Sequence, residues 1–201
     1  MVIVGYYTAY GRYEEPFRVS GNEIIITDNM NKLSSDLKKT VDKGGMTIVF
    51  PVGLKKISIG LFHNKKIKGV KFPDSLQVID SSAFGSCSLL EMVIFPPKLT
   101  EIGDYSFQYC SKLNYIKFND NLTKIGDGAF ECCRDLNTIN IPSSVIKIGD
   151  GAFARCSNLV EVNLSDNLEY LSSKLFWGCE SLKRVKIPKA SHTIQSKAFY
   201  G

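Results

Sequence analysis

The sequence has no apolar run near the roughly 20 residues that a membrane-spanning helix needs. Residues 1–5 lack the basic start and long apolar core of a secretory signal, so we expect neither a membrane span nor an export signal in the chain as written. Two histidines are present, and His63 and His192 fit no arrangement typical of hydrolases. Phosphate-binding loops and the G-x-S-x-G and H-E-x-x-H motifs are missing. We therefore expect a protein that is not an enzyme and uses no cofactor.

The six cysteines first suggest a disulfide framework, but their spacing indicates something else. Five of them recur at a step of 23 residues, and phenylalanines keep the same step three residues earlier. The cysteines are Cys87, Cys110, Cys133, Cys156 and Cys179, and the phenylalanines are Phe84, Phe107, Phe130, Phe153, Phe176 and Phe199. Self-similarity at a fixed period is the signature of a solenoid built from stacked coils.

Each coil is expected to hold one strand and one compact turn. Met92 and Ile94 alternate with Val93 and Phe95, which is the period of a strand with one buried face. Proline ends the strand because it offers no amide to a neighbour, and it follows the strand at positions 73, 96, 142 and 188. The Ala-Phe-x-x-Cys segment has apolar residues three apart, as in a single helical or 3₁₀ turn.

The segment from Ile141 to Leu159, IPSSVIKIGDGAFARCSNL, resembles the leucine-rich repeat of the BspA-like type, Leu-x-x-Ile-x-Ile-Pro-x-x-Leu-x-x-Ile-x-x-x-Ala-Phe-x-x-Cys. The repeat register runs from about Thr47 to Gly201. The resemblance implies a leucine-rich-repeat solenoid, α/β and horseshoe-like, with parallel strands on one face and short helical, 3₁₀ or irregular segments on the other. For that family it also implies surface-exposed proteins of bacteria and parasitic protists that adhere to host or partner molecules.

We divide the chain into an N-terminal capping segment, 1–45, and an array of about seven coils, 46–201, with the last coil incomplete. In the first segment we expect a strand at Ile24–Ile26 and a helix at Ser34–Lys43, capped by Ser34 or Ser35. Aromatic residues cluster around Gly5 and Gly11, either in a hairpin or loop packed over the first coil or in an exposed binding patch. They are Tyr6, Tyr7, Tyr10, Tyr13 and Phe17.

A cysteine that recurs at one position of a solenoid is typical of a small buried residue, so we expect reduced thiols in the core. A disulfide ladder is disfavoured because neighbouring coils present parallel Cβ vectors. Zinc is disfavoured because no C-x-x-C pair exists and Cys132 and Cys133 would point to opposite sides. The sequence thus predicts no metal site.

The formal net charge of +5 is unevenly distributed. Residues 43–73 contain seven lysines and no acid, and residues 181–201 contain five basic residues and no acid. Such runs are either solvated faces or a docking surface for an anionic glycan, a lipid head group or an acidic protein. We expect no nucleic-acid partner, because no stacking aromatics interleave with these lysines.

The outward positions of the strands change in chemistry from coil to coil, as in a nonuniform binding strip. We take them as candidate partner-binding residues, the alternative being solvent-facing residues of high β propensity. They are Lys71, Met92, Ile94, Tyr115, Lys117, Thr138, Asn140, Glu161, Asn163, Arg184 and Lys186.

The sequence thus favours a noncatalytic module that recognises a protein or glycan partner through this strip, in adhesion or surface recognition. The alternative is an intracellular interaction scaffold that self-associates end to end through an open C-terminal coil. The family resemblance implies a cell-surface or secreted location, whereas a true start at Met1 would favour the cytoplasm.

Overall fold

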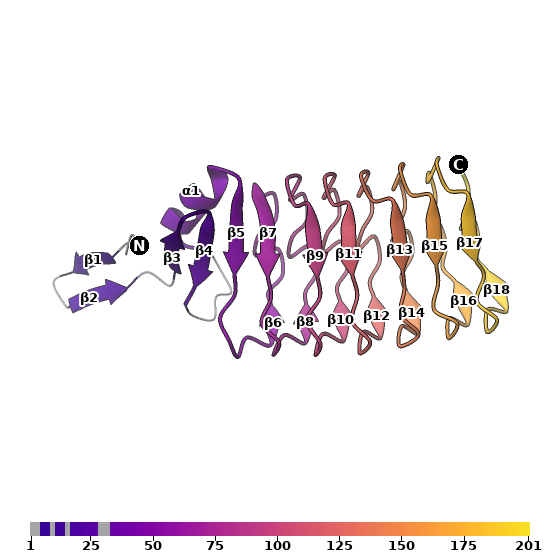
Figure 1. Ribbon diagram of the computed structural model, residues 1–201, viewed down its shortest axis with the longest axis horizontal. Helices are drawn as coiled ribbons and strands as arrows, with labels where there is room; N and C mark the ends of the chain where they lie inside the picture. The colour runs from indigo at the N-terminus through magenta and orange to yellow at the C-terminus, as the bar shows by residue number, and fades with distance from the viewer. Residues whose placement is uncertain (1–4, 9–10, 15–16, 28–32) are drawn as a thin grey trace.

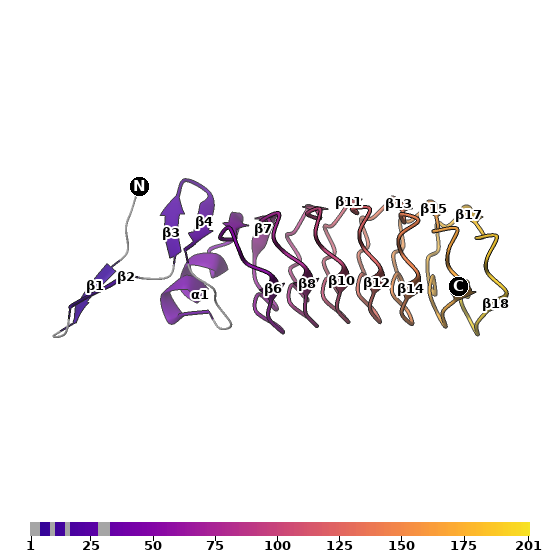
Figure 2. The same ribbon diagram turned by 90° about the horizontal axis from the view of Figure 1, so that it is seen from below.

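The protein is a rod of stacked coils in which strands from successive coils lie side by side (Figures 1 and 2). The structure, a computed structural model, describes residues 5–8, 11–14, 17–27 and 33–201, with side chains from Phe17 onward. Each coil from Met46 onward gives one strand to a first row and one shorter strand to a second row. The predicted solenoid of parallel strands is therefore confirmed.

From Met92 onward, the first row, which we call the strand face, pairs residues that are 23 positions apart. Tyr115 lies opposite Met92, and Ile116 lies opposite Val93. In the three-residue strands the middle side chain points into the core and the outer two point away, which confirms the predicted alternation. The row consists of β5 (Met46–Val49), β7 (Ile67–Lys71), β9 (Met92–Ile94), β11 (Tyr115–Lys117), β13 (Thr138–Asn140), β15 (Glu161–Asn163) and β17 (Arg184–Lys186).

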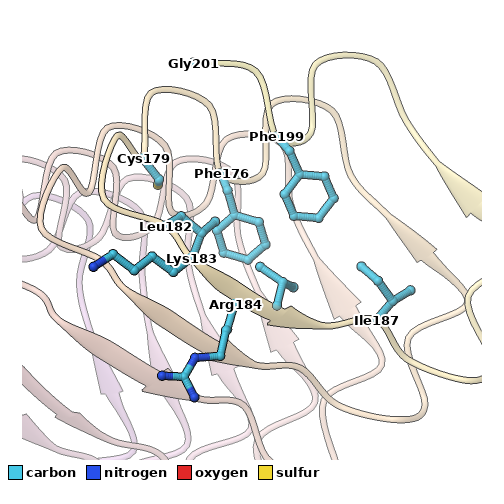
Figure 3. A pocket seen from close by; sticks show the side chains of 9 residues that line it. Phe176, Cys179, Leu182, Lys183, Arg184, Ile187, Phe199 and Gly201 are labelled. Atoms are coloured by element: carbon cyan, nitrogen blue, oxygen red, sulfur yellow. The ribbon is translucent and has the colours of Figure 1, made fainter.

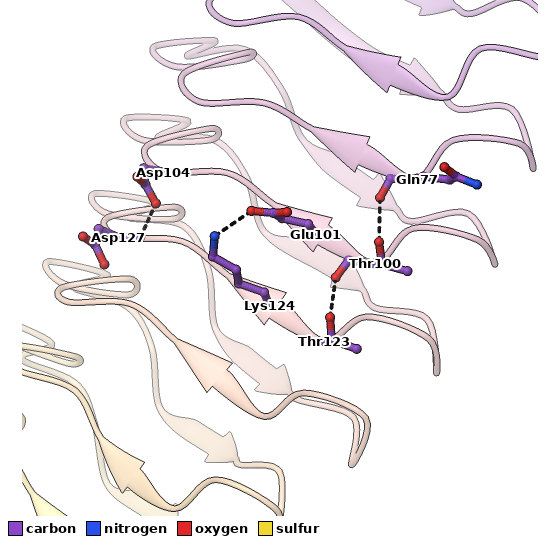
Figure 4. A network of polar contacts seen from close by, with 7 residues as sticks. All are labelled: Gln77, Thr100, Glu101, Asp104, Thr123, Lys124 and Asp127. Carbon is purple, nitrogen blue, oxygen red and sulfur yellow. Dashed lines mark hydrogen bonds and ion pairs between the residues drawn. The ribbon is translucent and has the colours of Figure 1, made fainter.

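The second row forms a parallel sheet of short strands, which was not predicted from the sequence. Each of its strands has two residues, of which typically one is buried, so the sequence shows no alternation to detect. Its members are β6 (Lys56–Ile57), β8 (Val78–Ile79), β10 (Glu101–Ile102), β12 (Lys124–Ile125), β14 (Lys147–Ile148), β16 (Tyr170–Leu171) and β18 (Thr193–Ile194). Polar side chains link neighbouring coils beside it, as between Lys124 and Glu101 at 2.6 Å (Figure 4).

The core is built around a column of phenylalanines, one from each coil. Consecutive rings from Phe62 to Phe199 stack with centroids 5.2–6.0 Å apart. Each repeating cysteine lies beside this column and donates its thiol hydrogen to a phenylalanine carbonyl of the preceding coil, as Cys110 does to Phe84 at 3.3 Å. All six cysteines are free and buried in the structure, and the five repeating ones lie in the core as predicted.

The Ala-Phe-x-x-Cys segment forms linked turns rather than a helix. Gln108 N donates to Tyr105 O and Cys110 N donates to Phe107 O, both at 3.2 Å, which is the i to i+3 pattern of 3₁₀ structure. The intervening amide of Tyr109 donates instead to Glu131 O in the next coil. Tyr105 and Tyr109 are left-handed, with φ of +55° and +59°, so the chain turns repeatedly and no helix propagates.

Two of the N-terminal strands continue the first row, and two others form a separate sheet. β1 (Gly5–Thr8) pairs antiparallel with β2 (Gly11–Glu14), and β3 (Phe17–Ser20) with β4 (Glu23–Ile26), which lies parallel to β5. The predicted helix is α1 (Ser35–Asp42), whose N-cap Ser34 accepts a hydrogen bond from Leu37 N. We propose that β3, β4 and α1 cap the first coil, since Leu37 and Val41 are fully buried. Except for Phe17, which is buried, the predicted aromatic cluster lies outside the described side chains.

Ser106 offers a test of the core. It is fully buried, and its hydroxyl has no hydrogen-bond partner among the described residues, whereas the same position is alanine at 83, 129, 152 and 198. A buried hydroxyl without a partner is destabilising, so Ser106→Ala should raise the free energy of unfolding by about 1 kcal/mol in urea denaturation. The mirror change, Ala129→Ser, should lower it by a similar amount. A loss of stability in Ser106→Ala would show that the hydroxyl is satisfied.

The thiols should differ in reactivity, because the thiolate is the reactive form. Burial raises the pKa of Cys87 to about 12 and the pKa values of Cys110 and Cys133 further above the usual range. In contrast, the neighbouring Cys156 thiol lowers the pKa of Cys179, which also lines the hollow at the last coil. With an aromatic disulfide reagent near pH 8 we expect one fast thiol in the folded protein, absent in Cys179→Ala, and six after denaturation without reductant. Fewer than six would mean that a disulfide exists.

Candidate functional site on the strand face

The outward side chains of the strand face are accessible as predicted. Of the eleven candidate residues, ten are exposed and Glu161 is half-buried. They come from strands whose neighbouring positions are buried in the core, so their direction is fixed by the backbone. That these residues bind a partner stays a prediction from the sequence.

An apolar patch occupies β9 and β11. Met92, Ile94 and Tyr115 are 46%, 51% and 48% exposed. Met92 pairs with Tyr115 across the ladder, and Ile94 pairs with Lys117. Methionine and tyrosine are enriched at protein interfaces, where a fixed apolar surface loses little entropy on binding. The patch is therefore suited to anchor a partner.

A hollow of about 340 Å³ opens next to this patch, between β11 and β13. The ladder of backbone hydrogen bonds joins β9 to β11 and β13 to β15, but in the described part of the chain no ladder joins β11 to β13. The hollow is lined by Tyr115, Ile116, Lys117, Phe118, Asp120, Asn140, Ile141 and Pro142. Three predicted residues, Tyr115, Lys117 and Asn140, thus meet at a concave site with apolar walls and polar ends.

Beyond the hollow the face becomes polar and then charged. The Asn163 amide donates to Asn140 Oδ1 at 2.7 Å, and Glu161 is paired in register with Arg184. Lys186 forms an ion pair with Asp166 at 3.2 Å. The strip therefore changes from apolar at β9 to charged at β17.

The N-terminal basic run is not a free cationic surface. Four of its seven lysines are paired with acids from outside the run: Lys56 with Asp80, Lys65 with Asp42, Lys68 with Glu91, and Lys71 with Glu23. Lys71 at the edge of the strand face is thus held by β4. The interpretation of this run as a docking surface for an anionic partner loses most of its support.

Sequence reasoning missed the hollow and five of its eight lining residues, among them Phe118 and Asp120. Phe118 is half-buried, and Asp120 is exposed at its rim. Asn119 lies between them, at a position where most coils have proline. This difference from the other coils is the sequence signal that could have indicated an irregular strand end here. Within the described residues, no group of three or more histidine, cysteine or acidic side chains is placed to hold a metal ion. None of the helices described there has the length and apolarity to cross a membrane.

These features, a parallel solenoid with a buried Phe-x-x-Cys column and a variable strand face, define a repeat protein of the leucine-rich type. A model of the BspA type leucine rich repeat region, in six copies, matches residues 20–118, 42–159 and 90–201. The chain belongs to this family. No curated protein shows a significant match to it.

Solved structures agree with this assignment. A T. pallidum leucine rich repeat protein is 28% identical, with a TM-score of 0.69 over 90% of this chain and 78% of that one. A leucine-rich repeat protein from Bacteroides ovatus is also 28% identical, with a TM-score of 0.75 over 98% of this chain. The chain spans 49% of that protein's length. The pneumococcal vaccine antigen PcpA, at 20% identity and a TM-score of 0.57 over 93% of this chain and 62% of that one, shares the fold.

Proposed function

We propose that this protein is a noncatalytic binding module that recognises a protein or glycan partner through the strand face. The observation that carries the proposal is the exposed patch of Met92, Ile94 and Tyr115 beside a hollow lined by Tyr115, Lys117 and Asn140. Methionine, isoleucine and tyrosine side chains on adjacent strands favour a protein over a glycan at this position.

The strand face supplies the rigidity that such a site needs. Val93 and Ile116, between the patch residues, are buried in the core, so the patch is presented by backbone that cannot easily rearrange. A partner side chain that enters the hollow would contact the Tyr115 ring and find Lys117, Asp120 and Asn140 as polar partners. Lys117 and Asp120 carry opposite charges, so the hollow suits an uncharged or dipolar group.

An adhesion or surface-recognition role is the biological setting that we propose. It is supported by the BspA-type family, whose resemblance implies surface-exposed proteins that adhere to host or partner molecules. The exposed patch supports the proposed binding surface, and the family supports the proposed location.

The patch can be tested by removing its two largest anchors. Met92→Ala with Tyr115→Ala should weaken binding to purified matrix and mucosal glycoproteins, measured by interferometry, by tenfold or more, because central anchors of an interface typically contribute about 1–2 kcal/mol each. Both side chains are half exposed, so the melting temperature should change little.

The matched control removes an isoleucine and a tyrosine from elsewhere on the surface. Ile146 and Tyr109 are exposed outside the strand face, and Ile146→Ala with Tyr109→Ala should leave binding unchanged. Equal binding by both double variants would mean that another face carries the contact.

A second candidate function is self-association through the C-terminal coil. Ile194 and Phe199 are 54% and 38% exposed, although the equivalent residues of the preceding coil, Leu171 and Phe176, are buried. A hollow of about 270 Å³ lies at this end, with Phe176, Phe199 and Ile187 around it (Figure 3). The occupant that we propose is a second copy of the chain, which would cover core-type side chains with the same kind of surface.

The basic residues of this coil set the expected salt dependence. Arg184 and Lys183 line the hollow, so two copies meeting end to end bring like charges together, and salt should strengthen the association by screening them. Light scattering should show a dimer that Ile194→Glu abolishes and Ile146→Glu, at an exposed isoleucine in the middle of the array, does not. A monomer at all concentrations and salt levels would contradict self-association.

A further inference from the structure

The linked turns of successive coils form a second surface, which we call the turn face, and one backbone position recurs along it. Six residues at a spacing of 23 have φ between +54° and +61°: Ser82, Tyr105, Gly128, Gly151, Lys174 and Lys197. Glycine adopts this left-handed conformation freely, whereas residues with a side chain are strained in it. Two adjacent coils use glycine there, and the coils on either side carry the large side chains of Tyr105 and Lys174.

The two glycines form the floor of a hollow of about 270 Å³. Its walls are Tyr105 on one side and Trp177 on the other, with Glu131 and Asp150 between them. A Cβ atom at Gly128 would stand 2.5 Å from two ring carbons of Tyr105, so the tyrosine ring lies directly over this glycine. The backbone strain at Tyr105 is not required by the coil, because Gly128 and Gly151 show that glycine serves the same position.

The wall residues are held in place before any ligand arrives. The Arg155 guanidinium stacks over the Trp177 ring at 4.4 Å from its centroid, which fixes the indole. Gln108 donates to Glu131 Oε2 at 2.7 Å, and Ser173 N donates to Asp150 Oδ1 at 3.1 Å. Each carboxylate keeps further lone pairs that can accept hydrogen bonds.

The chemistry of the hollow selects among ligand classes. Tyr105 and Trp177 lie three coils apart, about 14 Å at the usual strand spacing, so an elongated ligand can contact both. Two carboxylates disfavour an anion. Lys174 and the Arg155 side chain already stacked on Trp177 disfavour a cation. Aromatic faces pack against C–H groups, and carboxylates accept hydrogen bonds from hydroxyl groups. A neutral sugar chain presents both kinds of group.

We propose that this hollow on the turn face binds a short neutral oligosaccharide, with Tyr105 and Trp177 as stacking surfaces and Glu131 and Asp150 as acceptors for sugar hydroxyls. The site shares no residue with the strand face, so a protein partner there and a glycan here can be bound at the same time. Failure of either proposal leaves the other standing.

Trp177 is the only tryptophan in the chain, so intrinsic fluorescence reports directly on this hollow. Titration of the whole protein with maltotriose, cellotriose and triacetylchitotriose should change the emission for at least one of them. Tyr105→Gly should weaken that response at least tenfold, yet leave the melting temperature unchanged or slightly raised, because glycine relieves the left-handed strain. Glu131→Gln should weaken it less, since an amide oxygen still accepts a hydrogen bond.

Tyr109→Gly is the matched control, because Tyr109 is also an exposed tyrosine at positive φ but does not line the hollow. It should bind the sugars as the unmodified protein does. Absence of any response to the three sugars at millimolar concentration would overturn the proposal, as would equal loss in both tyrosine variants. A Tyr105-dependent response to oligolysine without one to the sugars would also overturn it, in favour of a cationic ligand.

Discussion

The stacked phenylalanine column and the carbonyl groups beside it are the constraint on which the rest of this structure depends. The Phe84 carbonyl accepts a hydrogen bond from Cys87 N in its own coil and from the Cys110 thiol in the next, and the same pair of contacts recurs along the rod. The coil from Phe62 to Phe84 is one residue shorter than the others, yet its rings stack and the Cys87 thiol still donates to the Phe62 carbonyl. The register between coils is thus held by an aromatic contact and a buried hydrogen bond together, which explains why cysteine, a small apolar residue with a weak donor, keeps this position.

Because the core fixes about eight positions in each coil, chemical variety is restricted to the surfaces. On the strand face the variable positions change from apolar at Met92 to charged at Arg184, and on the turn face they change from Tyr105 through two glycines to Lys174. In a solenoid of this kind, equivalent surface positions of successive coils line up in linear strips, one on each face. Function therefore resides in the few coils where adjacent strip positions combine, and not in the repeat itself.

Periodicity was sufficient to predict the solenoid, the buried thiols and the exposure of residues such as Met92 and Tyr115, since one coil defines the environment of the same position in all others. It was insufficient where a feature depends on contacts between coils or on backbone conformation. The ladder break after Tyr115, the ion pairs that neutralise Lys65 and Lys71, and the second row of two-residue strands all arise from contacts between coils that a single repeat does not contain. The left-handed turn positions were also missed, because Tyr105 and Lys174 are not residues that signal positive φ.

The one-dimensional packing also explains how the two binding surfaces that we propose can share one small protein. Each coil contacts mainly its neighbours, so a substitution at an exposed position affects the structure of only one or two coils on one face. Tyr115 on the strand face and Tyr105 on the turn face belong to adjacent coils, yet the buried ring of Phe107 and the side chains of Ile116 and Leu113 lie between the two surfaces. The core residues that the coils share therefore separate the side chains of one face from those of the other. Sites on the two faces are then energetically independent to a first approximation, which allows each to acquire its own ligand without disturbing the fold.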